Sequence, residues 1–271
     1  MELTAAELWR AIGAAQAFTM RGAPGFEARL TPTGWLIATG EPVADFNILM
    51  VDYGPDPEGQ LRAFGEVLRQ RELPALVVLG EAVTDRLKGP ATDLGLQAAG
   101  HIPLMVHRLA DVGSGVPESN RYRVAVVTDA AALALANQLS VAAFGLPSAS
   151  VDRVVTPAML TTPGLTFFLA WDGAQPVSTV MTMRVGSTVG IWSMATSPDR
   201  QRQGAGRAVL HHALAHHQAQ GPALFYLLAT EAGKPLYEAT GFRTLAEPAV
   251  WLRGHSAQVA SWERLEADRS R

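Results

Sequence analysis

Apolar residues along the chain follow two patterns that predict its secondary structure. Short apolar runs are typical of buried strands, and apolar residues that recur every three or four positions are typical of helices. The spacing of Thr4 and Glu7 predicts a capping box at the start of a first helix. In the first half we expect strands at residues 26–30, 34–38, 46–51, 74–79 and 103–106, and helices at 60–72 and in the stretch that ends at His101.

The second half of the chain repeats this order of elements. A strand is expected at 122–127, followed by a helix that Asp129 can cap and that runs to about residue 143, and by a second helix at 148–158. Hairpins that turn at 172–175 and 186–187 lead to a central strand at 188–195. A helix that includes residues 207–214, a strand at 222–229, a helix that ends at Gly241 and two strands around residues 246–248 follow, with a terminal helix beyond Gly254.

Composition and charge narrow the class of protein. The 271 residues, of which 48% are hydrophobic and 17% charged, are enough for two domains of ordinary size. A formal net charge of -3 gives no basic surface for nucleic acid, and the absence of cysteine excludes disulfides, thiolate metal sites and a cysteine nucleophile. The N-terminus lacks the basic start of a signal peptide, and no apolar run is long enough to span a bilayer, so we expect a cytoplasmic protein without a membrane partner.

A glycine-rich loop between the central strand and the next helix is the main candidate for chemistry. Residues 201–206 read Gln-Arg-Gln-Gly-Ala-Gly. A helix N-terminus attracts phosphate through its unpaired N–H groups and its dipole, and glycine lets the backbone approach a ligand closely. The nucleoside-triphosphate loop requires Gly-Lys-Ser or Gly-Lys-Thr, and the dinucleotide fingerprint requires glycine or alanine where Val209 stands, so neither fits. An ordinary glycine-rich helix start is the alternative.

The hexapeptide resembles the Gln/Arg-x-x-Gly-x-Gly/Ala motif of the GNAT superfamily of acyl-CoA N-acyltransferases. A second stretch, Leu-Tyr-Glu-Ala-Thr-Gly-Phe at residues 236–242, is similar to the family's signature for the helix after the fifth strand. Both motifs stand in the family's order. The resemblance implies an α/β (α+β) fold for this half, with a mixed, mostly antiparallel sheet flanked by helices.

The resemblance also implies acetyl-CoA as cosubstrate, no metal, and a set of cofactor-binding residues. In the family the loop holds the pyrophosphate of coenzyme A, which assigns that role to Gln201, Arg202, Gln203, Gly204, Ala205, Gly206 and Arg207. The end of the central strand should pair with the pantetheine arm, and a backbone N–H there can polarise the thioester carbonyl; its residues are Met194, Ala195 and Thr196. Thr230 stands where the family often has asparagine, and is a candidate contact that departs from the pattern.

Two residues are candidates for acid–base chemistry. By resemblance, Tyr237 would protonate the leaving thiolate, since a phenol with a pKa of about 10 can protonate a thiolate whose thiol has a pKa of about 8.5. The alternative for Tyr237 is packing against the cofactor. Glu231 could act as a base directly or through water, or could be a carboxylate favoured by a helix dipole. His212 and His216 lack the third ligand of a zinc site, so we expect them on a solvated helix face.

Short matches between the halves predict a degenerate second lobe of the same kind. Pro-Ala-Leu at 74–76 recurs at 222–224, and residues 96–101 match 237–242; an unrelated α/β domain is the alternative. In place of the glycine loop, the first half has Pro-Asp-Pro-Glu-Gly at 55–59, whose prolines lack N–H donors and whose carboxylates would repel a pyrophosphate. Leu96 takes the place of Tyr237. We therefore expect that the first lobe does not bind coenzyme A.

These expectations combine into tandem GNAT-like lobes. A degenerate lobe is expected at residues 1–110, a linker at 111–120, a GNAT N-acetyltransferase domain at 121–254 and a helical tail at 255–271. The predicted function is transfer of an acetyl group from acetyl-CoA to a primary amine, by direct attack in a ternary complex. The acceptor is expected to be a small molecule, with the first lobe shaping its site or a homodimer. A non-catalytic module that binds or senses acyl-CoA is the alternative.

Overall fold

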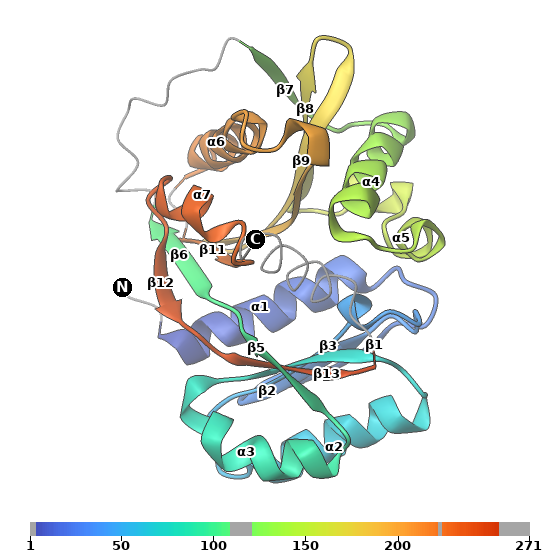
Figure 1. Cartoon of the computed structure of the whole chain (residues 1–271), viewed down its shortest axis with the longest axis vertical. Helices are drawn as coiled ribbons and strands as arrows, with labels where there is room; N and C mark the ends of the chain where they lie inside the picture. Colours follow the sequence, from blue (N-terminus) through green and yellow to red (C-terminus); the bar gives the residue numbers. More distant parts are fainter. Residues whose placement is uncertain (1–3, 109–120, 222–223, 255–271) are drawn as a thin grey trace, which may run out of the picture. The chain divides into compact units, whose positions relative to one another are not determined.

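The computed structural model describes residues 4–108, 121–221 and 224–254 (Figure 1). The linker expected at 111–120 and the terminal helix expected at 255–271 lie outside the described residues. The chain divides into two compact units. Unit 1 comprises Met1–Leu104, Leu228–Ala232 and Thr244–Arg271, and unit 2 comprises Met105–Leu227 and Gly233–Arg243.

Unit 1 is a six-stranded sheet with helices on both faces. Thr4 and Glu7 form the predicted capping box, with the Glu7 N–H donating to Thr4 Oγ1 at 3.2 Å. The first half of the chain supplies α1 (Ala5–Met20), β1 (Glu27–Thr31), β2 (Gly34–Ala38), η1 (Ala44–Phe46), β3 (Asn47–Val51), α2 (Pro57–Gln70), β4 (Ala75–Leu79), α3 (Glu81–Asp93) and β5 (Gln97–His101). The strand order is β1-β2-β3-β4-β13-β5, where β13 (Ala249–Arg253) comes from the far end of the chain.

Alternating side chains of β2 explain how the helices cover this sheet. Trp35 faces α1 and donates from its indole to the Trp9 carbonyl at 3.0 Å. Leu36 points the other way, into the core formed with α2 and α3. Gly13 of α1 allows the close approach, because a Cβ there would lie 2.4 Å from the Trp35 ring.

Unit 2 carries a seven-stranded sheet in the order β12-β6-β11-β10-β9-β8-β7. The helix expected at 148–158 ends at Val154, since Pro157 starts a separate 3-10 turn. The elements are β6 (Leu104–Arg108), β7 (Tyr122–Val126), α4 (Ala130–Phe144), α5 (Ser148–Val154), η3 (Pro157–Thr161), β8 (Leu165–Asp172), β9 (Gln175–Val185), β10 (Thr188–Thr196), η4 (Pro198–Arg200), α6 (Ala205–Gln218), β11 (Leu224–Leu228), α7 (Lys234–Glu238) and β12 (Arg243–Ala246). No helix within the described ranges is long and apolar enough to cross a membrane.

The two halves of the chain exchange strands. β6 follows β5 in the sequence but lies between β12 and β11, and β13 follows β12 but lies between β4 and β5. Four consecutive residues of β6, 104–107, and three of β13, 249–251, are buried. The sequence analysis assigned residues 104–108 to the first lobe and 249–253 to the second. In the structure each strand completes the sheet formed mainly by the other half.

The helix predicted to end at His101 is α3, which ends at Asp93. This earlier end changes which residue of the first half corresponds to Tyr237. Residues 97–101 form β5, which pairs with β13 at the sheet edge, so tertiary pairing overrides the alanine-rich local sequence. The Leu96 N–H donates to the Ala91 carbonyl at 3.1 Å, and the Phe242 N–H donates to the Tyr237 carbonyl at 3.0 Å, in equivalent helix-ending turns. The counterpart of Tyr237 is therefore Ala91, and the match of Tyr237 with Leu96 was wrong.

A buried histidine lies in the core of unit 2. His217 of α6 is 1% exposed, and its Nε2 lies 2.8 Å from Thr182 Oγ1. Its Nδ1 has no hydrogen-bond partner among the described residues. Burial lowers the pKa of His217 to about 4, because the imidazolium would lose its hydration.

We predict that a fragment of residues 121–271, the second half of the chain, cannot fold on its own. Such a fragment lacks β6, which leaves the edges of β11 and β12 unpaired, and it gives β13 no sheet to join. The fragment should aggregate or self-associate, which light scattering and thermal unfolding would measure against the full chain. A soluble monomer that unfolds as cooperatively as the full chain would contradict the strand exchange.

We also predict that His217 contributes to acid sensitivity. Between its unfolded pKa of about 6.5 and its folded pKa of about 4, the unfolded state binds a proton that the folded state does not, so stability falls as pH falls through this range. The loss should reach up to about 2 kcal/mol between about pH 7 and about pH 5. Denaturant unfolding of His217→Gln should show a smaller loss over that range than the wild type, with His212→Gln at an exposed position of the same helix as the control for the substitution. Equal pH dependence in all three proteins would refute this role.

Candidate functional site

The candidate site begins where the parallel strands β10 and β11 part. Their pairing covers only Thr188–Gly190 against Leu224–Tyr226, although β10 continues to Thr196. In unit 1 the corresponding parallel strands are β3 and β4. They pair from Ile48 with Leu76 to Val51 with Leu79, so the pairing continues to the last residue of both strands. The end of β10 therefore has a backbone edge outside the parallel ladder, and an extended ligand could hydrogen-bond to such an edge.

A β-bulge shapes the same part of β10 on its other edge. Trp192 pairs with Met181, and Ala195 pairs with Thr179. Ser193 and Met194 on β10 therefore lie opposite the single residue that separates Met181 from Thr179 on β9. Ser193 has a φ of 46°, a left-handed conformation that is uncommon for residues other than glycine. Bulges redirect side chains and often occur next to active sites. Here the bulge lies at the strand end that the sequence analysis assigned to the cofactor.

The glycine-rich loop leads from η4 into α6. Gly204 is the N-cap residue, with φ 93° and ψ -4°, and no side chain caps the first turn among the described residues. Arg202 also has a left-handed φ, of 58°. A helix start without a side-chain cap leaves N–H groups for an anion, and left-handed residues help to form such anion-binding turns.

The equivalent helix start in unit 1 is already capped. Asp56 is the N-cap of α2, and its Oδ1 accepts the Gly59 N–H at 2.9 Å. Pro57 removes a further N–H at the first helical position. In unit 1 a carboxylate of the protein therefore accepts an N–H group at the helix start, whereas the helix start in unit 2 has no side-chain cap among the described residues.

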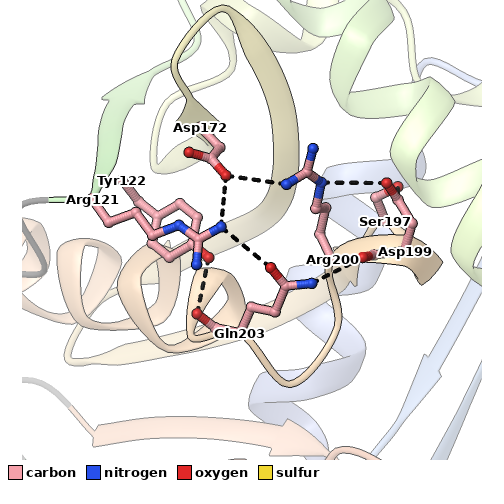
Figure 2. Close-up of polar contacts among 7 residues, drawn as sticks. All are labelled: Arg121, Tyr122, Asp172, Ser197, Asp199, Arg200 and Gln203. Atoms are coloured by element: carbon pink, nitrogen blue, oxygen red, sulfur yellow. Dashed lines mark hydrogen bonds and ion pairs between the residues drawn. The ribbon is translucent and has the colours of Figure 1, made fainter.

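Four side-chain hydrogen bonds support the glycine-rich loop of unit 2. The Tyr122 hydroxyl donates to the Gln203 carbonyl at 2.9 Å, and Arg121 donates to Gln203 Oε1 at 3.2 Å (Figure 2). Gln203 Nε2 donates to the Asp199 carbonyl at 3.0 Å, and Gln201 Nε2 donates to the Thr196 carbonyl at 3.4 Å. The side chains of both glutamines thus support the loop.

Four of the predicted cofactor and catalytic residues come together at the start of α6. A Cβ on Gly206 would lie 3.2 Å from Thr196 Oγ1 and 3.3 Å from Met194 Cε, so the helix start packs closely against the strand end. The Tyr237 hydroxyl donates to Met194 Sδ at 3.4 Å. Tyr237 is 8% exposed, and burial raises its pKa above that of a free phenol. The loop, the end of β10 and the tyrosine of α7 therefore meet at one place.

The other predicted residues have varied surroundings. Arg202 and Arg207 are exposed, Ala205 is buried in the first turn of α6, and the Ala195 carbonyl accepts a hydrogen bond from Ser178 at 2.9 Å. Thr230 is half-buried and Glu231 is exposed. Both follow β11 in the segment counted with unit 1, so their roles stay predictions.

His107 of β6 is a residue of this region that the sequence analysis missed. Its Nδ1 lies 3.0 Å from the Gly241 carbonyl, which can only accept, so Nδ1 carries the proton. The ring lies 5.1 Å from the Phe242 ring, which is 5.7 Å from that of Tyr237. His107 thus supports the turn that follows Tyr237. No sequence motif marks His107. It was missed because its strand, β6, was assigned to the other lobe.

A family comparison agrees with this geometry. Residues 163–244, from the start of β8 into β12, match the model of the acetyltransferase (GNAT) domain. Residues 163–244 belong to a GNAT domain. The matched residues include both the glycine-rich loop and the Leu-Tyr-Glu-Ala-Thr-Gly-Phe motif, so the resemblance seen in the sequence is confirmed.

Solved structures with GNAT folds resemble almost the whole chain. A GCN5-related N-acetyltransferase from Kribbella flavida has a TM-score of 0.66 and 16% identity, over 92% of this chain and 96% of that one. Another from Sphaerobacter thermophilus has a TM-score of 0.62 and 13% identity, over 82% and 76%. A tandem GNAT protein from the clavulanic acid biosynthesis pathway has a TM-score of 0.56 and 13% identity, over 94% and 98%. No match was found among curated proteins.

These likenesses confirm the predicted fold class of two mixed, mostly antiparallel sheets flanked by helices, in a tandem GNAT layout. The GNAT domain and its fold support an acyltransferase activity in general. At such low identity the structural likeness carries the fold alone. The chemistry must be argued from the residues of the site itself.

Proposed function

We propose that the GNAT domain transfers an acetyl group from acetyl-CoA to a primary amine, by direct attack within a ternary complex. The observation that carries the proposal is the meeting of Gly206, Met194 and Tyr237, which brings together a helix start without a side-chain cap, a strand edge outside the parallel ladder and a buried hydroxyl. The proposal takes a small-molecule amine as the acceptor and the cytoplasm as the setting. No metal is needed, because positioning the amine next to the thioester supplies much of the rate.

In this proposal the loop and the strand end bind opposite parts of the cosubstrate. Backbone N–H groups at the start of α6 bind the pyrophosphate, and the exposed Arg202 and Arg207 add positive charge. The segment Met194–Thr196 hydrogen-bonds to the pantetheine arm through its backbone. A backbone N–H of this segment polarises the thioester carbonyl, as in an oxyanion hole.

Tyr237 is proposed as the general acid. The amine nitrogen bonds to the acetyl carbon, the carbon–sulfur bond breaks, and the Tyr237 hydroxyl donates to the thiolate that leaves. Burial raises the pKa of Tyr237, which keeps the hydroxyl protonated before the step and also makes the phenol a weaker acid than it is in water. The hydroxyl donates to a thioether sulfur, which is a weak acceptor, so a thiolate would compete well for it. Glu231 is proposed to take the amine proton, directly or through water.

Release of free thiol from acetyl-CoA across a panel of amines tests the proposed function. Thiol release that depends on one class of primary amine, with the matching N-acetyl product, would support it. If coenzyme A binds but no amine in the panel releases thiol, a non-catalytic module that senses acyl-CoA becomes the better explanation. If coenzyme A does not bind, both explanations fail.

The helix start should bind one coenzyme A per chain, and Gly204→Glu should abolish this binding. The substitution brings a carboxylate to the helix start without a steric clash, since the nearest atom to an added Cβ, in Tyr122, would be 3.8 Å away. Calorimetric titration should give one site in the wild type and none in the variant, because Asp56 caps the equivalent helix of unit 1.

The matched control is Gly186→Glu in the turn between β9 and β10. Gly186 also has a left-handed φ, of 57°, and an added Cβ meets nothing within 4 Å, so this variant makes the same charge change at another left-handed glycine. It should bind like the wild type. One site left in Gly204→Glu would assign coenzyme A to another part of the chain.

Tyr237→Phe tests the proposed acid. The substitution keeps the ring and its packing against Phe242 and removes only the hydroxyl. With chemistry shown to be rate-limiting, kcat should fall by about 10²-fold, the usual scale for a positioned acid. The KM for acetyl-CoA should change little, because the loop and the strand edge remain. An unchanged kcat would remove Tyr237 from the mechanism and leave solvent as the acid.

A further inference from the structure

A network of ion pairs joins the β8–β9 hairpin to the glycine-rich loop (Figure 2). Asp172 is the last residue of β8, and its Oδ2 accepts hydrogen bonds from two arginines, Arg121 at 2.9 Å and Arg200 at 3.3 Å. Its side chain is 25% exposed, and those of the arginines are 48% and 36% exposed. One carboxylate oxygen therefore orients two guanidinium groups that come from different segments of unit 2.

The two arginines connect Asp172 to two points along the connection between β10 and α6. Arg200 is the last residue of η4, and it also pairs with Asp199 at 3.3 Å. Arg121 reaches the connection nearer to α6, where it donates to Gln203 Oε1 at 3.2 Å, one residue before the N-cap Gly204. Arg202 lies between these two anchor points, and its φ of 58° needs such support.

The charges of this network are balanced within the protein. Arg121 and Arg200 both pair with Asp172, and Arg200 also pairs with Asp199. Arg202 and Arg207, in contrast, are exposed on the loop and at the start of α6. This distribution separates two arginines that hold the loop from two that are available to an anion.

We propose that Asp172 is a positioning residue for the pyrophosphate of coenzyme A, which it would not touch. Through Arg121 and Arg200 it holds the loop in the conformation that presents its N–H groups. This inference rests on the proposed binding of coenzyme A by the loop. A binding loop held in place before the ligand arrives loses less conformational entropy on binding, so the contribution of Asp172 should be to affinity.

The test compares Asp172→Asn with the wild type on two acetyl donors. Asparagine keeps the size of the side chain and removes the charge that the arginines share. The KM for acetyl-CoA should rise about 10-fold, the scale expected when a charged network of several contacts is broken, while kcat at saturation stays within about 2-fold. S-acetylpantetheine lacks the pyrophosphate, so its kcat/KM should not change. Asp152→Asn on α5, an exposed position in the same unit, is the control for charge and should match the wild type.

A second measurement needs no turnover. Hydrogen exchange in the ligand-free protein should be faster at residues 201–206 in Asp172→Asn than in the wild type, with the rest of unit 2 unchanged. Equal losses on both donors, or faster exchange throughout unit 2, would show a general structural role and overturn the inference. So would an unchanged KM for acetyl-CoA. If the wild type neither binds coenzyme A nor releases thiol, the proposed function itself fails. This result concerns the wild type alone, so it is distinct from the results with Asp172→Asn that would overturn only the inference.

Discussion

The candidate site depends on the short pairing of two parallel strands. After Gly190, β10 no longer pairs with β11, so a backbone edge is left out of the ladder within an otherwise continuous sheet. The bulge at Ser193 and Met194 follows directly, and the loop and α6 continue from the same strand. Met194 and Thr196 lie at this strand end, and Gly206 and Tyr237 pack against it.

Unit 1 shows what the same layout becomes when these features are absent. Its parallel strands stay paired to the end of β3, Asp56 caps the helix that follows, and Ala91 occupies the position of Tyr237. At the equivalent positions, which the structure describes, this unit therefore has a paired strand end, a capped helix start and an alanine in place of the phenol. Its fold remains, because the apolar core between the sheet and its helices α2 and α3 needs none of these features.

The strand exchange gives the first half of the chain a part in the candidate site. β6 completes the sheet next to β11 and brings His107 to the Gly241 carbonyl, at the turn after Tyr237. A Cβ on Gly241 would lie 3.0 Å from this imidazole, so the glycine of the family motif also makes room for the histidine. A sheet completed by a strand from the other half couples the stability of the two halves.

The sequence alone determined the features that short stretches of chain encode. A helix cap at Thr4, a glycine-rich helix start at residues 204–206 and the motif around Tyr237 depend on neighbouring residues, so the GNAT fold class followed from their pattern. Only the tertiary structure revealed the exchange of β6 and β13, the ending of α3 before Leu96, and the contacts of His107 and Asp172. Arg121 and Gln203 are 82 positions apart, and His107 and Gly241 are 134 apart. Contacts between residues so far apart in the sequence depend on which strands pair with each other. The spacing of apolar residues predicts that a strand forms but does not specify its partner strand.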